Sequence, residues 1–366
     1  MPENLAETQR PMKRLVFYFL FSGSCLAVFS QDTPVPEKYD STYYERYPHK
    51  LAIGPILSKK NTTFAIGSKE QGGPLRYSTN TPTRVGVSVG YDWLSVSASV
   101  GLGTLDPDYK KDKGKTKSIN FQWSVTGQSV LADLHFQVNK GLYLRGEQDP
   151  SFSSEPYYVR PDIRTQIFGV TVRKILNSRQ FSIKPPFVFD TWQKRSAGSF
   201  MLGGEFVYGS ARGDSALVPA GLAQHFPDAA VNHMHYIMFG PTLAYAHSFV
   251  ISNHFFVTAV ASVNGDAAQT FEQNTSGDQK TRWYFTPNIS MRGAIGYNAR
   301  DWELVASAIS NRFFIGANEK DIHYQNYSDQ FRLAYIRRIN AGKAIPAAVN
   351  WGRKIIETLG FGFLID

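Results

Sequence analysis

The sequence has a single cysteine, Cys25, among its 366 residues. A chain with no second cysteine forms no internal disulfide, so its stability has to come from packing and hydrogen bonding. Long apolar runs are also missing: beyond residue 30, no segment reaches the roughly 18 uninterrupted apolar residues that a transmembrane helix requires. If this chain enters a membrane, it does so as strands.

Charged residues are scarce, at 19% of the chain, whereas aromatic residues make up 14%. The apolar residues occur in short runs, which is typical of a β-rich protein. The formal net charge of +9 has a visible source in the lysine-rich segment 105–117. We interpret this segment as a solvated loop tip; contact with acidic lipid head groups or polyanions is the alternative.

The segment 12–32, MKRLVFYFLFSGSCLAVFSQD, has the order of a secretory signal peptide. Basic residues precede a short apolar run, and Val28 and Ser30 are small enough for the minus-three and minus-one positions of a cleavage site. We therefore expect residues 12–30 to be a signal peptide and residues 1–11 a mis-assigned extension. An exported chain is not expected to bind nucleic acid.

Strict alternation marks the stretch SINFQWSVTG, residues 118–127. Because a strand turns successive side chains to opposite faces, this segment has one apolar and one polar face. The apolar face consists of Ile119, Phe121, Trp123 and Val125, and the polar face of Ser118, Asn120, Gln122 and Ser124. The apolar face contacts either a protein core, as in a soluble sandwich, or lipid.

The same alternation recurs in hairpin pairs through most of the chain. After the pairs at 84–102 and 118–139, we expect further strands near 163–176, 180–190, 198–209, 235–250, 253–264, 281–297, 301–314 and 328–339. The carboxyl end, 358–366, alternates like a closing strand, and a short amphipathic helix is expected at 343–357.

Short turns alternate with long connections along the chain, which is typical of transmembrane barrels. Aromatic residues lie beside the short turns, where an interfacial girdle would lie; they are Tyr91, Trp93, Tyr297 and Trp302. Long connections are expected at 103–115, 145–160, 265–280 and 315–327. Two places resist this order: the stretch 181–210 holds either one strand or two, and the connection 211–232 is long where a short one is expected.

The sequence therefore predicts an all-β fold, an antiparallel transmembrane β-barrel of about 12 strands, with about 14 as the alternative, short periplasmic turns and long extracellular loops. We expect residues 49–366 to form the barrel and residues 31–48 to be an N-terminal periplasmic segment. The role of residues 31–80 stays open among an extra strand, a periplasmic extension and a plug.

Several stretches, in order, resemble a Bacteroidetes family of outer-membrane barrel proteins of unknown function. They are YDSTYYERYPHKLAI (39–53), NTPTRVGVSVGYDWLSVS (80–97), RPDIRTQIFGV (160–170), QKRSAGSF (193–200), GDSALVP (213–219) and FGPTLAYAHSFVISNHFF (239–256). Arg195 stands where the QKKSAGS-like motif of the family has lysine, a change that keeps the charge. The resemblance implies an outer-membrane location and a barrel, and it implies no activity.

No catalytic motif emerges from the sequence. Lipid-modifying barrel enzymes place histidine and serine two residues apart on one strand face, whereas His247 is followed directly by Ser248. His233 and His235 have same-face spacing, but a polar loop entering a strand explains them better than a metal site. The sequence indicates no metal and no cofactor, and we expect the protein not to be an enzyme.

Charged residues on the expected inward faces are the candidate lumen lining. They are Asp133, His135, Lys194, Arg195, Glu205, Arg282, Arg292, Glu303 and Arg332. Charges of both signs there form either a salt-bridge network that fills the barrel or a lining that selects solutes.

The expected function is passage or binding of a small solute or lipid, or a structural role in the envelope. The alternative is an outer-membrane lipid-modifying hydrolase with an active site at the rim. Expected partners are outer-membrane lipid, lipopolysaccharide, the barrel-assembly machinery and a small-molecule ligand.

Overall fold

The computed structural model describes residues 39–47, 49–68, 73–105, 111–144, 157–316 and 323–365. The expected extension at 1–11 and signal peptide at 12–30 lie outside these residues. The described strands are β1 (Tyr44–Arg46), β2 (Lys50–Gly67), β3 (Leu75–Ser78), β4 (Arg84–Tyr91), β5 (Leu94–Gly101), β6 (Lys117–Thr126), β7 (Val130–Leu144), β8 (Tyr158–Ile175), β9 (Thr191–Gln193), β10 (Ala197–Arg212), β11 (Val231–Ile251), β12 (Phe255–Asn274), β13 (Gln279–Asn298), β14 (Trp302–Ile315) and β15 (His323–Asn340).

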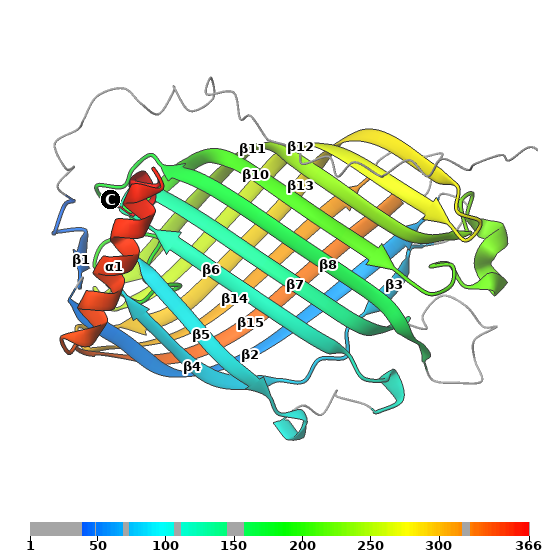
Figure 1. The fold of residues 1–366 in the computed structure, drawn as a ribbon. Helices are drawn as coiled ribbons and strands as arrows, with labels where there is room; N and C mark the ends of the chain where they lie inside the picture. The colour runs from blue at the N-terminus through cyan, green and yellow to red at the C-terminus, as the bar shows by residue number, and fades with distance from the viewer. Residues whose placement is uncertain are drawn as a thin grey trace, which may run out of the picture. The chain divides into compact units, whose positions relative to one another are not determined.

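The strands form a closed antiparallel barrel (Figure 1). In the described part of the chain, one 13-stranded sheet runs from β15 back to β6, and the pairing of β15 with β2 and of β6 with β7 closes it. The short strand β3 bridges β2 and β7 at one end of the barrel, and the other strands of this sheet follow one another around the wall. The predicted all-β antiparallel barrel is confirmed.

Alternation sorts the side chains of the wall into an outer and an inner set. On β13, Phe285 is 73% and Met291 57% exposed, whereas the neighbouring Thr286 and Asn288 are almost fully buried. The outward residues of the other long strands follow the same rule, with Phe200, Leu243, Phe249, Val263, Leu304 and Phe331 exposed. The barrel therefore carries its apolar side chains on the outside, as a transmembrane barrel does.

The two ends of the barrel differ in their connections. At the first end, short turns follow β4, β6, β11 and β13; we call this the tight-turn end. The turn after β11 reverses sharply because Ser252 and Asn253 have positive φ angles of 51° and 63°. At the opposite, long-loop end, extended connections follow β5, β7, β10 and β14. The expected long connection at 265–280 is wrong, because β12 and β13 continue to the four-residue turn 275–278.

The irregular stretch around residues 180–190 is not a strand. Residues 176–196 are one long connection at the tight-turn end, interrupted only by the three-residue β9. Once this segment no longer counts as wall, the connection 213–230 falls at the long-loop end, where a long connection is expected. Two exceptions to the expected order are the long connection 176–196 at the tight-turn end and the short turn 275–278 at the long-loop end. The apolar side chains of 181–190 suggested a strand because they are buried, but what buries them is the inside of the barrel.

The carboxyl end does not form the expected closing strand. The helix α1 (Ala344–Thr358) follows β15 and is succeeded by the short 3-10 helix η6 (Gly362–Leu364). The helix packs on the outer face of the wall through a cluster that includes Val349, Tyr91 and Trp93. Those two aromatic residues are therefore covered by protein rather than placed in a girdle. Among the described residues, no helix combines the length and hydrophobicity that a membrane crossing requires.

Candidate functional site

The connection 176–196 folds into the tight-turn end of the barrel and closes it. Phe181, Phe189 and Thr191 are 1% exposed or less. Strand β9 pairs with β1, so the N-terminal segment contributes to the same closure. Within it, Lys184 and Asp190 form an ion pair at 3.0 Å, with both side chains buried. We call this segment the inner closure.

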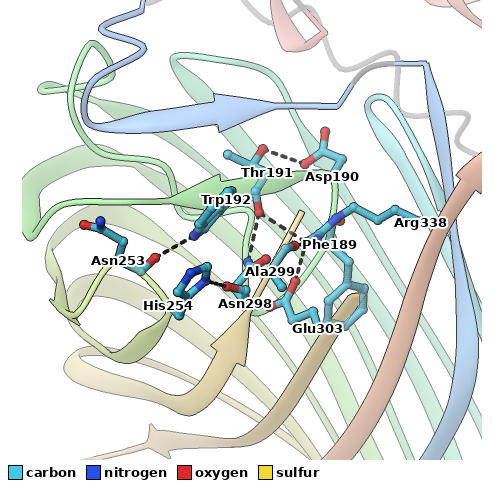
Figure 2. A network of polar contacts seen from close by, with 10 residues as sticks. All are labelled: Phe189, Asp190, Thr191, Trp192, Asn253, His254, Asn298, Ala299, Glu303 and Arg338. Carbon is cyan, nitrogen blue, oxygen red and sulfur yellow. Dashed lines mark hydrogen bonds and ion pairs between the residues drawn. The ribbon is translucent and has the colours of Figure 1, made fainter. Parts of the chain in front are cut away.

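Arg338 fastens the inner closure to the wall (Figure 2). Its guanidinium forms an ion pair with Glu303 at 2.6 Å, and both side chains are fully buried. The same group donates to the carbonyl oxygens of Phe189 at 2.7 Å and of Ala299 at 2.6 Å. Arg338 therefore links the wall strands β14 and β15 to the inner closure. Tyr47 packs beneath this guanidinium, and burial raises the pKa of its phenol to about 12.

Apolar side chains close the long-loop end. The connection 213–230 contributes Leu217, Val218, Leu222 and Phe226 to a cluster with inward residues of most of the wall strands, among them Phe64, Tyr77, Ile167, Val207, Met234, Tyr236, Phe313 and Tyr324. Tyr77 donates a hydrogen bond of 2.6 Å to the carbonyl oxygen of Leu217. We call this cluster the outer closure.

Arg282 links this end of the wall to the connection 213–230. It forms ion pairs with Glu272 and, at 2.5 Å, with Asp228 of that connection. Burial alone would raise the pKa of Asp228, but hydrogen bonds from Arg282 and Lys280 hold it below its ordinary value. The carboxylate of Asp228 is therefore ionised at neutral pH.

A polar chamber lies inside the wall, between the two closures. Residues from both faces of the strands border it. Its cavity volume is about 50 Å³. Its polar lining consists of Lys60, Gln122, Asp133, His135, Gln137, Thr171, Arg173, Glu205, Asn264, Ser290, Arg292, Asn311, Ser328 and Gln330. The described residues include no group of three or more His, Cys, Asp or Glu side chains that could hold a metal ion.

One cation of the chamber is balanced by a direct partner. Arg292 and Asp133 form an ion pair at 2.7 Å, and Ser124 donates a further hydrogen bond of 2.7 Å to Asp133. Arg292 also lies over the ring of Phe187, 6.0 Å from its centre, so the inner closure borders this pair.

Arg173 has no such ion pair in the described structure. Its residue is 3% exposed, and its Nε and Nη1 atoms have no hydrogen-bond acceptor in the described structure. It interacts electrostatically with Asp133 and Glu205 but also with Arg292, which carries the same charge. A buried guanidinium with unused donors is unfavourable unless an acceptor is supplied.

Two carboxyl groups, those of Glu205 and Asp266, are close neighbours at the chamber. Asn264 donates to Glu205 at 2.6 Å, and Asn288 donates to Asp266 at 2.5 Å. Without counting His135, the lining of the chamber has three cations, Lys60, Arg173 and Arg292, against two carboxyl groups, Asp133 and Glu205. The excess charge is positive.

The structure brings four of the residues singled out from the sequence into this chamber: Asp133, His135, Glu205 and Arg292. The Nε2 atom of His135 is buried without a hydrogen-bond partner in the described structure. Arg282 lies near the outer closure. Glu303 and Arg332 lie at the inner closure, where Arg332 is 5.0 Å from the ring of Phe189.

Lys194 and Arg195 do not line the lumen, which corrects the expectation. Strand β10 begins only at Ala197, so both residues belong to the connection that precedes it. Lys194 pairs with Glu45 at 3.1 Å, and Arg195 is exposed beside the ring of Tyr43.

Sequence reasoning missed Arg173, Lys60 and Arg338. A signal for Arg173 existed, because the alternating Phe168, Val170 and Val172 fix one face of its strand as apolar and so turn Arg173 inward.

A closed antiparallel barrel with an apolar outer surface and a polar, charged interior has the architecture of a transmembrane β-barrel. Residues 38–338 match the family described as "Domain of unknown function (DUF4421)", and the chain belongs to that family.

Solved structures with a similar fold include outer-membrane barrels. The outer membrane protease OmpT of Escherichia coli shares 12% identity over 81% of this chain and 98% of its own, with a TM-score of 0.36. The toluene transporter TodX of Pseudomonas putida shares 10% over 79% and 90%, with a TM-score of 0.28. The beta domain of the Bordetella autotransporter BrkA shares 10% over 78% and 99%, with a TM-score of 0.35. No curated protein matches the chain.

Proposed function

We propose that this protein is an outer-membrane β-barrel that binds a ligand with an anionic group in the chamber between its two closures, as a step in the passage of that ligand. The observation that carries the proposal is the buried guanidinium of Arg173, which has unused donors and faces an excess of positive charge. A carboxylate or phosphate supplies the acceptors that this site lacks.

The membrane location rests on the outer surface. Exposed apolar side chains surround the wall, and the ring of Tyr297 stacks on Trp302 at 4.9 Å near the tight-turn end, where an interfacial girdle is expected. Such a continuous apolar surface is unfavourable in water and favourable in lipid.

The proposal extends to the route of the chain. A signal peptide at 12–30, a Bacteroidetes origin, folding by the barrel-assembly machinery and contact with lipopolysaccharide all accord with an apolar barrel surface of this kind. The alternative role, a lipid-modifying hydrolase with a rim site, has no specific observation in its favour among the described residues.

Titration of the folded barrel in nonionic detergent with butyrate and with inorganic phosphate tests the chamber. We expect Arg173→Gln to weaken binding of the better of these two anions at least tenfold, which corresponds to about 1.4 kcal/mol. The matched control is Arg312→Gln, because Arg312 pairs with Asp329 on the outward face, at 2.8 Å, and should leave binding unchanged. Equal affinity in Arg173→Gln and the unsubstituted protein, or no binding of either anion, contradicts the proposal.

A further inference from the structure

The wall has a break between β5 and β6. These two strands pair only at Leu94 with Val125 and at Ser95 with Ser124. Beyond this point, residues 96–101 of β5 and 117–123 of β6 have no strand between them, and the two strands diverge in Figure 1. Each keeps its other neighbour along its whole length, β5 pairing with β4 and β6 with β7. The break is therefore a feature of one seam, which we call the window.

The window opens to the inside of the barrel. Inward-facing residues of the intact wall are buried, as Thr286 and Asn288 show. At the window, Ser97, Asn120 and Gln122 also face inward, since they share a face with residues that contact the lumen, yet all three are exposed. Gln122 is at the same time part of the lining of the chamber.

Protein closes the window at the long-loop end. Asn80 donates a hydrogen bond of 2.7 Å to the carbonyl oxygen of Gly114, just before β6. Thr81 donates one of 2.6 Å to the carbonyl oxygen of Lys60 on β2. The paired residues of β5 and β6 bound the window at the tight-turn end, so it is an opening within the wall and not a frayed rim.

The window lies within the apolar outer surface. On its flanks, Val96, Val100, Ile119 and Phe121 are all at least half exposed and point outward. The strand edges that face each other carry backbone N–H and C=O groups without ladder partners. In lipid, such groups require a polar partner. An occupant that suits the window therefore has polar atoms for the edges and an apolar part for the flanking side chains.

We propose that the window is a lateral portal, through which a single-chain amphiphile with an anionic head, of the fatty-acid class, reaches the chamber from the membrane. This inference rests on the proposed function and names the ligand class of the same site. The head passes Gln122 and is drawn to Lys60 and Arg173, while the acyl chain stays among the outward apolar side chains of β5 and β6. Both closures can then stay shut during entry.

A reversible block of the window tests this portal. Cys25 is replaced by serine, Gln122→Cys is introduced, and the folded barrel in lipid vesicles is treated with a bulky thiosulfonate reagent. We expect the modification to slow the uptake of a spin-labelled stearic acid at least tenfold, and dithiothreitol to restore the rate. The control is Ile295→Cys, which is 61% exposed on the outer face of β13 and should change the rate less than twofold after the same treatment.

Butyrate binding separates the two proposals. If the modified Gln122→Cys protein takes up the spin-labelled acid at the unmodified rate, the portal is overturned. Binding of butyrate without binding of the stearic acid also overturns the portal and leaves the anion-binding chamber in place. Failure of the stearic acid, butyrate and inorganic phosphate alike to bind the unmodified protein overturns the chamber as well.

Discussion

Replacing Arg338 with methionine is expected to lower the free energy of unfolding by about 3–5 kcal/mol. The substitution leaves the carboxylate of Glu303 fully buried without its cation. It also removes the donors that hold the carbonyl oxygens of Phe189 and Ala299 (Figure 2), so the inner closure loses its attachment to the wall. Unfolding by guanidinium chloride in lipid vesicles measures the change.

A double substitution distinguishes the lost ion pair from lost packing. Arg338→Met combined with Glu303→Leu removes both charges, and we expect it to recover a large part of the loss, because no unpaired charge stays buried. The control is Asp301→Asn, which breaks the more exposed pair between Lys50 and Asp301 and should cost at most about 1 kcal/mol. Equal losses for Arg338→Met and Asp301→Asn contradict the role assigned to the buried pair.

A charge in the middle of the outer surface is the second substitution with a large expected effect. Met291 lies on β13 midway between Tyr297 and Trp283 and is 57% exposed. Met291→Arg is expected to destabilise the barrel in lipid by about 2–4 kcal/mol, because a cation at that depth faces hydrocarbon. We also expect less protein to assemble. The measurement is the fraction that migrates in the compact, heat-modifiable form on a gel.

Gln279→Arg is the matched control on the same strand. Gln279 is exposed at the start of β13, next to the turn 275–278 at the long-loop end, where a charge reaches water, and we expect a cost of about 0–1 kcal/mol. If both arginines are tolerated equally, the outer surface of β13 does not face lipid.

The wall could be predicted from the sequence because the alternation of outward and inward residues is visible within each single strand. On the strand expected at 281–297, alternation was enough to place Arg282 and Arg292 inward, and the structure pairs them with Glu272 and Asp133. The helix at 343–357 was also expected, and α1 occupies 344–358.

The inner closure could not be predicted because a buried connection and a paired strand both occur as short apolar runs in a sequence. The segment FSIKPPFVFD, 181–190, is as apolar as a wall strand, yet its side chains are buried within the barrel and form no ladder. The periodicity of the sequence does not predict the ion pair between Lys184 and Asp190.

The window escaped prediction for a related reason. Phe121 and Gln122 alternate as they would on a fully paired strand, and the sequence does not state whether the neighbouring strand follows. Lys60 was not placed because residues 31–80 stayed open among an extra strand, a periplasmic extension and a plug. The chamber therefore depends on spatial neighbours that only the structure supplies.

The central claim is that the wall of this barrel separates lipid from an enclosed polar interior. A nitroxide scan of β13, one residue at a time from 279 to 298 in lipid vesicles, tests it most directly. The account predicts a period of two in collision with oxygen, with high values at outward sites that peak near Met291 and low values at inward sites such as Ser290. Equal oxygen collision at neighbouring sites, or access of a water-soluble nickel chelate to Met291, would contradict it.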